Sequence, residues 1–363
     1  MAKKLSSDLA LFAVTAALLG FGLVMVWSAS SVLAQERHGN AYHFLLRQAL
    51  WAGIGLVAMS VALRVDYRKL RAPKYVYGLA ILTTLLLILV LFLRPVNETH
   101  RWIRFGVLSF QPAELAKLSL ILFLASHLER RGERVNEFLT SLFPVLLLLG
   151  WFAFLVFVQP DLGSAAILVV TAAVMLFVAG VRLRYFAALA VPASVLLYFA
   201  IAGAQYRWAR IVSFFNPWAD ARGSGYQIIQ SMIAVGTGGI TGVGFMDGRQ
   251  KQFYLPYPYS DFIYAVIGEE LGLIGAVTVV AAFLFLLWRG LRAAFKAPDA
   301  FGMFLAAGLT LAIVLQAVIN MSVVLGLVPT KGIPLPFISA GGSSLLFTLV
   351  SIGLILNVSQ HAD

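Results

Sequence analysis

The chain has 363 residues, of which 61% are hydrophobic and only 12% are charged, and its formal net charge is +11. A water-soluble globular protein of this composition would precipitate, so the sequence predicts a protein that lies in a lipid bilayer. The basic residues fall in short connectors between apolar runs instead of on one polar face, which argues against a nucleic-acid partner. The chain has no cysteine, which excludes disulfides, thiolate metal sites and a cysteine nucleophile.

Apolar runs of membrane-spanning length recur along the chain, since a helix needs roughly 20 residues to cross about 30 Å of hydrocarbon. The basic start MAKKLSSDLALF lacks a small-residue cleavage site, so we expect a retained first helix there. We expect one all-α polytopic membrane domain over 1–363, with a long external loop at about 203–260 between helices 7 and 8. Its transmembrane helices, about ten of them, are expected near 8–29, 44–63, 75–93, 113–128, 142–158, 163–180, 185–202, 261–288, 301–322 and 342–358.

The distribution of Lys and Arg over the short connectors predicts the orientation of the chain. If the N-terminus is cytoplasmic, most of these residues fall inside, among them the cluster Arg64, Arg68, Lys69, Arg71 and Lys74. Both termini are therefore expected to be cytoplasmic. The segments RWIRFGVLSFQPAE, QPDLG, 203–260 and PTKGIPLPFISAGGSS then lie outside, where ATP is unavailable. A substrate at that face would have to bring its own activated bond, as a lipid-linked substrate does.

The stretch YLPYPYSDFIYAVIGEELGLIG, residues 254–275, carries three carboxylates at the start of an expected helix. Asp261 could be an N-cap or first-turn acid that stabilises this helix by about 1 kcal/mol. It could also be a carboxylate at the mouth of a cavity, where it accepts a proton from a sugar hydroxyl or holds a divalent cation. Glu269 and Glu270 lie about two turns deeper, where an ionised side chain needs a partner.

Several other polar groups each allow a structural and a functional interpretation. Glu114 and Lys117 are neighbours on one helix face, so they form either a structural ion pair or a phosphate-binding cation with its orienting acid. Asp161, in the turn QPDLG, is a candidate helix cap. Four arginines suit either anionic headgroups or interfacial anchoring, because they lie outside and near tryptophans: Arg101, Arg104, Arg207 and Arg210.

Two segments rich in glycine or proline indicate irregular backbone at the outer end. GYQIIQSMIAVGTGGITGVGF predicts a short interfacial helix followed by pliable backbone, without the context of a phosphate loop. Pro334, Pro336, Gly341 and Gly342 would break a helix before the last span, which is tolerated where the backbone lines a cavity. Asn320 in the ninth span adds an uncharged hydrogen-bonding group.

The motifs NPWADARGSGYQIIQSMIAVGTGGITGVGF, RQKQFYLPYPYSDFIYAVIGEELG and PTKGIPLPFISAGGSS, with RWI, QPAELAKL and QPDLG, cover most of the chain. Together they resemble the SEDS family of bacterial shape, elongation, division and sporulation proteins. SGYQIIQS, RQKQFYLP and PTKG look more like the division branch, FtsW, than the elongation branch, RodA. The chain departs from the family pattern at four positions, where Ala113, Tyr259, Ser260 and Ala340 replace the usual Ser, His, Thr and Tyr.

The resemblance implies a peptidoglycan glycosyltransferase that polymerises lipid II at the outer face of the bacterial cytoplasmic membrane, for septal wall synthesis. It also implies a class B penicillin-binding protein, a transpeptidase, as partner, together with other division proteins. Asp261 matches the family's essential aspartate and becomes the candidate general base or metal ligand, with Mg²⁺ or Mn²⁺ as a possible cofactor. The candidate substrate-binding residues are Glu114, Lys117, Arg101, Arg210, Gln111, Asp161, Lys331 and Ser343.

Two other functions agree with the same sequence. A lipid II flippase would also carry intramembrane acids and broken helices. A non-catalytic scaffold that holds the transpeptidase is the third possibility. The position of all the motif segments on the outer side favours the enzyme, because a flippase would also need recognition groups on the cytoplasmic side.

Overall fold

The computed structural model describes residues 7–95, 99–106 and 108–361, and most of them are helical. The spans expected from hydropathy all correspond to helices, which confirms the polytopic α-helical fold. These helices are α1 (Leu9–His38), α2 (His43–Arg64), α3 (Pro73–Leu89), α4 (Pro112–Arg131), α5 (Phe143–Val158), α6 (Leu162–Val178), α7 (Leu183–Ala202), α10 (Ile263–Phe295), α11 (Ala300–Val324) and α12 (Ser343–Ser359).

Seven segments among the described residues are long and apolar enough to cross a membrane: those of α1, α2, α3, α5, α7, α10 and α11. The apolar helices α6 and α12 are shorter. α4 has a suitable length, but it carries Glu114 and Lys117 and is more polar than the others. The chain is therefore a multi-pass membrane protein.

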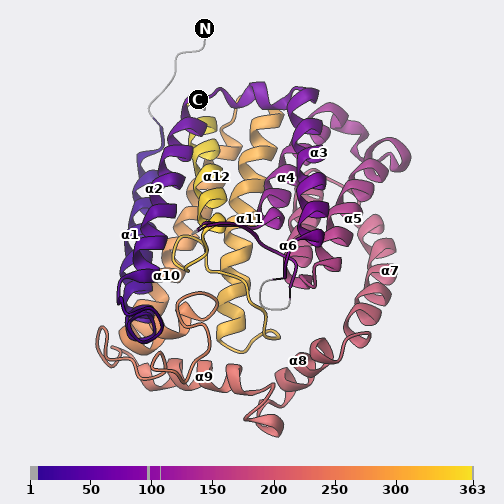
Figure 1. Ribbon diagram of the computed structural model, residues 1–363. Coiled ribbons are helices and arrows are strands. Elements are labelled where there is room, and N and C mark those ends of the chain that lie inside the picture. The colour runs from indigo at the N-terminus through magenta and orange to yellow at the C-terminus, as the bar shows by residue number, and fades with distance from the viewer. Residues whose placement is uncertain (1–6, 96–98, 107, 362–363) are drawn as a thin grey trace.

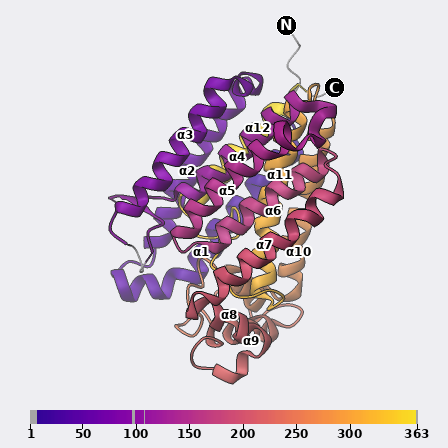
Figure 2. The same ribbon diagram turned by 90° about the vertical axis from the view of Figure 1, so that its right-hand side faces the viewer.

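The bundle has two chemically different ends (Figure 1). Both termini lie at one end, where the backbone N–H of Asp8 donates to the Ser359 hydroxyl over 3.2 Å. The short helices α8 (Gln205–Phe215) and α9 (Tyr226–Gly238) lie at the opposite end. α11 runs through the centre and packs against α10, α4, α6 and α12. α7 stands at the edge of the bundle in both views and buries none of its residues (Figures 1 and 2).

Some local structure was not expected from the sequence. The RWIRFGVLSF segment contains an antiparallel hairpin of β1 (Ile103–Phe105) and β2 (Leu108–Phe110), in which Arg104 pairs with Ser109. The amphipathic helix α8 was also missed, whereas α9 confirms the predicted short helix. Turns between helices add the single-turn segments η1 (Tyr67–Arg71), η2 (Val90–Phe92), η3 (Gly132–Asn136), η4 (Phe138–Leu142) and η5 (Pro217–Asp220).

The glycine-rich segment after α9 pairs with a break in α10. Gly272 inside α10 has φ 63°, a left-handed conformation that interrupts the helix. The freed backbone is paired with 239–244: Val243 N–H donates to the Glu269 carbonyl over 3.0 Å, and Leu273 N–H donates to the Gly239 carbonyl over 2.9 Å. A Cβ on Gly242, which has φ 84°, would collide with the α10 backbone at Glu270. The glycines therefore allow two backbones to approach closely.

Candidate active site

Asp261 lies in the loop between α9 and α10, and its side chain is partly buried. α10 begins at Ile263 with Phe262 as its N-cap, and no side chain forms a capping hydrogen bond there. The interpretation of Asp261 as a helix cap is therefore wrong, and the carboxylate is available for another role.

Asp261 belongs to a charged cluster that also contains Asp161, Lys331, Arg101 and Arg210. These groups lie close enough for their charges to act on one another, and they are outside the membrane-spanning segments. Burial raises the pKa of Asp261 to about 6, although Ser260 and the three cations oppose the shift. Burial also lowers the pKa of Lys331, against the effect of Asp161. The cluster thus contains a carboxylate that titrates near neutral pH beside three cations.

Asp161 organises one side of the charged cluster. Its carboxylate caps α6 through the Ser164 backbone N–H, which confirms the predicted cap, and it also lies 3.1 Å from Lys331 Nζ. Burial alone would raise the pKa of Asp161, but Lys331 and Arg101 hold it below its usual value. Arg101 donates to the backbone carbonyls of Gln159 and Pro160, so it stabilises the QPDLG turn.

Two further candidates are joined to Asp161. Gln111 Nε2 donates to the Asp161 carboxylate over 3.1 Å, and Gln111 N–H donates to the Ser343 hydroxyl over 3.0 Å. Ser343 is fully buried at the start of α12. Arg210, on α8, has no hydrogen bond or ion pair for its guanidinium within the described residues, while burial lowers its pKa. Arg210 is thus the cation of the charged cluster with the fewest competing partners.

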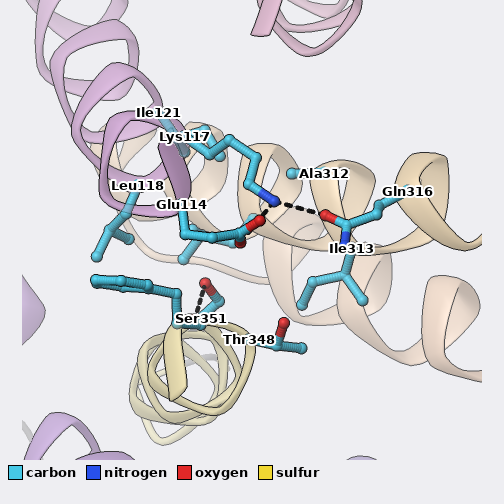
Figure 3. A pocket seen from close by; sticks show the side chains of 11 residues that line it. Glu114, Lys117, Leu118, Ile121, Ala312, Ile313, Gln316, Thr348 and Ser351 are labelled. Carbon is cyan, nitrogen blue, oxygen red and sulfur yellow. Dashed lines mark hydrogen bonds and ion pairs between the residues drawn. The ribbon is translucent and has the colours of Figure 1, made fainter. Parts of the chain in front are cut away.

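Glu114 and Lys117 lie together in a pocket next to Gln316 (Figure 3). Lys117 Nζ lies 2.7 Å from the Glu114 carboxylate and donates to Gln316 Oε1 over 2.5 Å. A cavity of about 30 Å³ opens beside the pair, between α4, α11 and α12, and Thr348 and Ser351 also line it. The pair is connected to the loop before α12 because Gln316 Nε2 donates to the Pro334 carbonyl over 2.9 Å.

The deeper acids Glu269 and Glu270 have the partners that the sequence required. Glu270 is fully buried and lies 2.6 Å from Lys251 Nζ, while the Ser28 hydroxyl donates to its carboxylate. Glu269 accepts hydrogen bonds from the backbone N–H groups of Arg249 and Gln250. Both acids therefore bind the loop that precedes Asp261 and hold it in place.

The two loops that meet at Asp261 also hold unusual backbone. Four non-glycine residues have positive φ there: Met246, Phe253, Tyr257 and Phe337, at 68°, 70°, 53° and 65°. Such conformations cost about 1–3 kcal/mol each, and they concentrate at functional sites. The positive-φ residues therefore indicate the same two loops as the charged cluster does, and they do so without reference to charge.

A family model described as a cell cycle protein, covering FtsW, RodA and SpoVE, matches residues 9–363. The chain belongs to this FtsW/RodA/SpoVE family. It is 46% identical over 359 residues to "Probable peptidoglycan glycosyltransferase FtsW" of Geobacter metallireducens, covering 98% of this chain and 95% of the relative. It is 43% identical over 361 residues to the stage V sporulation protein E of Bacillus subtilis, covering 99% of each.

Solved FtsW/RodA/SpoVE-like structures have the same fold. A chain of a peptidoglycan synthase complex, solved for the structural coordination of polymerization and crosslinking, matches with a TM-score of 0.80 and 31% identity over 98% of both chains. The rod shape determining protein RodA of Thermus thermophilus matches with a TM-score of 0.72 and 28% identity. That match covers 98% of this chain and 97% of RodA.

The residues around Asp261 do not fit a divalent cation held by protein ligands alone. Within the described parts of this FtsW/RodA/SpoVE chain, no group of three His, Asp or Glu side chains could bind a metal ion. Around Asp261 the neighbouring charges are mainly cationic, and Asp161 is already engaged by Lys331, Gln111 and Ser164. Mg²⁺ or Mn²⁺ as a cofactor stays a prediction.

Some residues that organise the site were not predicted as part of it. Lys251, Gln316 and Ser28 make buried contacts between segments far apart in the chain, and spacing in the sequence does not reveal such pairings. One signal was available: Gln316 and Asn320 lie one turn apart in the apolar helix α11, where buried amides need partners.

Proposed function

We propose that this chain is a peptidoglycan glycosyltransferase that polymerises lipid II into glycan strands for septal wall synthesis during cell division. The observation that carries the proposal is Asp261, a carboxylate with a pKa of about 6 beside three cations. It precedes α10, and Arg289 near the other end of α10 pairs with Asp8, so Asp261 lies at the end of the bundle opposite the termini. The names of the relatives support the same activity. We place this end at the outer face of the bacterial cytoplasmic membrane, with both termini cytoplasmic.

Asp261 acts as the general base in the proposed reaction. Lipid II is already activated, because its anomeric carbon is α-linked to a pyrophosphate. The acceptor hydroxyl oxygen forms a bond to this carbon while the bond to the pyrophosphate oxygen breaks, so one displacement gives an inverted β linkage. The hydroxyl proton passes to the Asp261 carboxylate. No covalent enzyme intermediate is required.

The cations of the charged cluster stabilise the departing undecaprenyl pyrophosphate, which leaves with the electron pair of the broken bond. Arg210 suits this role best because its guanidinium has no ion-pair partner among the described residues. Lys331 and Arg101 complete the positive side. Asp161 holds Lys331 through an ion pair, and the backbone carbonyls of Gln159 and Pro160 hold Arg101. Lys117 is paired with Glu114 and Gln316, so we assign it to the inner wall of the substrate cavity.

The partner that we propose is a class B penicillin-binding protein, whose single transmembrane helix packs against an apolar face of this bundle. The similar chain from a peptidoglycan synthase complex supports this assignment. Crosslinking in membranes should join the transpeptidase helix to this chain within the bilayer. Crosslinks between soluble parts alone would refute the proposed contact.

The test is to supply the purified chain and its transpeptidase partner with lipid II in detergent and to analyse the glycan products. Detergent removes the sidedness of the membrane, so polymer formation cannot be mistaken for flipping. Glycan strands that withstand inhibition of the transpeptidase support the glycosyltransferase. Translocation of labelled lipid II in vesicles without any polymer in detergent would support the flippase, and the absence of both activities would support the scaffold.

A further inference from the structure

The backbone that carries Asp261 is held at three successive carbonyl groups. Ala340 N–H donates to the Tyr259 carbonyl over 2.9 Å, and the Ser339 hydroxyl donates to the Ser260 carbonyl over 2.5 Å. Asn320 Nδ2 donates to the carbonyl of Asp261 itself over 2.8 Å. We call these three donors the carbonyl clamp. It fixes the aspartate through its backbone and leaves the carboxylate available.

Asn320 differs from the other two donors because it binds two loops at once. Its Nδ2 atom also donates to the Ile333 carbonyl over 2.6 Å, so both amide hydrogens are used. Because both partners are carbonyl acceptors, the orientation of the amide is determined. Asn320 is 1% exposed and lies in the central helix α11, so the carbonyls that it binds have little access to water.

The second loop carries Lys331, one of the cations of the charged cluster. Lys331 is two residues before Ile333, and Gly332 between them lies against the aspartate: a Cβ on Gly332 would be 2.5 Å from Asp261 Oδ2. One turn earlier on α11, Gln316 holds the Pro334 carbonyl. α11 therefore acts as a rigid support that sets the spacing between the carboxylate and the lysine-bearing loop.

We propose that Asn320 is a positioning residue for the glycosyl transfer, which sets the distance between Asp261 and the Lys331 loop through its two carbonyl contacts. The inference rests on the proposed role of Asp261 as general base. Asn320 is too deep in α11 to be assigned a contact with the sugar. Its removal should let the two loops separate, and a displacement of about 1 Å at a reacting group lowers a rate by about 10²-fold.

The chain supplies a matched control for this role. Asn357 in α12 is also fully buried, and its Nδ2 also donates to backbone carbonyls, those of Leu63 and Val65 over 2.6 Å and 2.8 Å. Asn357 is two residues before Ser359, which accepts from the Asp8 N–H, whereas Asp261 precedes α10, whose other end reaches Asp8 through Arg289. Asn357 also donates to the Ala62 carbonyl and accepts from the Tyr67 N–H, so Asn357→Ala removes more side-chain bonds than Asn320→Ala without touching the charged cluster.

The experiment is a double-mutant cycle on lipid II polymerisation by the detergent-solubilised complex with the transpeptidase. The variants are Asn320→Ala, Asp261→Asn, their combination and Asn357→Ala, with thermal stability and co-purification of the partner measured for each. Asn320→Ala should lower kcat by about 10²-fold and leave KM for lipid II nearly unchanged. In the Asp261→Asn background it should cause no further loss, because its effect passes through the aspartate. Asn357→Ala should lower the Tm but keep kcat per folded molecule.

If Asn320→Ala fails to fold, Asn320→Leu replaces it, since leucine has a similar volume and suits an apolar helix. Losses that add in the double mutant, or a kcat for the folded Asn320 variant close to that of the unmodified chain, would overturn the positioning role. An equal fall of kcat in Asn357→Ala would overturn it too, since the effect would then be one of general stability. Full activity of Asp261→Asn would instead refute the role of Asp261 as general base, and no polymerisation by the unmodified chain would refute the proposed function itself, so the failures are distinguishable.

Discussion

Asp261 and its cations show how one end of an apolar bundle supplies both acid–base and electrostatic chemistry. Burial raises the pKa of the aspartate to about 6, while Lys331, Arg210 and Arg101 keep it from rising further. A base is most effective when its pKa is near the working pH, since it must be ionised and still accept a proton. In the proposed reaction, the same cations stabilise the charge that the departing pyrophosphate gains. The proposed mechanism therefore uses one electrostatic environment for both halves of the displacement.

The titration of Asp261 predicts the pH dependence of the reaction. Below a pH of about 6 the carboxylate is protonated and cannot accept the hydroxyl proton, so kcat/KM for polymerisation should fall about tenfold per pH unit. Lys331→Met removes a charge that stabilises the ionised form, so its acidic limb should move to higher pH. The measurement is kcat/KM against pH for both proteins. An acidic limb unchanged by Lys331→Met would contradict the proximity of the two charges.

At the scale of elements, the interrupted helix α10 and the loop before it form one unit. The carboxylates of Glu269 and Glu270 hold this loop through backbone N–H groups and through Lys251. The break at Gly272 frees backbone groups that pair with the glycine-rich segment 239–244. The first turns of α10, the loop before Asp261 and the segment 239–244 thus pack together. The acids of the otherwise apolar helix α10 hold this loop in place.

The buried Lys251–Glu270 pair should be a strong determinant of stability. Glu270→Gln leaves the Lys251 ammonium buried without its counter-charge, and such changes cost about 3–5 kcal/mol. The measurement is thermal or denaturant unfolding of the purified protein. Glu129→Gln is the control, because its partner Arg71 is half exposed and surface pairs contribute only about 0–1 kcal/mol. Similar small losses from both substitutions would show that the Lys251–Glu270 pair contributes little.

Hydropathy predicted the membrane helices well because length and apolarity are properties of each segment by itself. The break in α10 was not predicted, since its conformation at Gly272 depends on pairing with 239–244. Asp261 and Asp161 both precede helices, yet only Asp161 is a cap. The charged cluster joins residues from five separate segments, and only the folded chain brings them together. Motif resemblance selected the site residues, but it could not reveal their contacts.

At the scale of the whole molecule, the basic connectors that predict the orientation lie apart from the candidate active site. The basic η1 segment and both termini lie at one end, and α8, which carries Arg210 of the charged cluster, lies with α9 at the other (Figure 1). Positively charged connectors favour the cytoplasmic side. Under the proposed orientation, this polarity places the charged cluster at the outer face of the membrane.

The orientation can be measured with topology reporters inserted at residues 69 and 249. Lys69 lies in η1 and Arg249 lies in the loop before Asp261, so we expect a cytoplasmic signal at the first and an external signal at the second. Growth of cells that depend on each tagged protein checks that the tag preserves the fold. The opposite pattern would overturn the assignment of the site to the outer face.

The most direct test of the account is lipid II polymerisation by Asp261→Asn in the purified complex with the transpeptidase. Asparagine keeps the shape of the side chain but is not a proton acceptor of comparable strength, so polymerisation should fall by about 10²- to 10⁴-fold. Folding and partner binding should be retained, as measured by thermal unfolding and co-purification. Glycan synthesis at a nearly normal rate by well-folded Asp261→Asn would contradict the assignment of Asp261 as the general base.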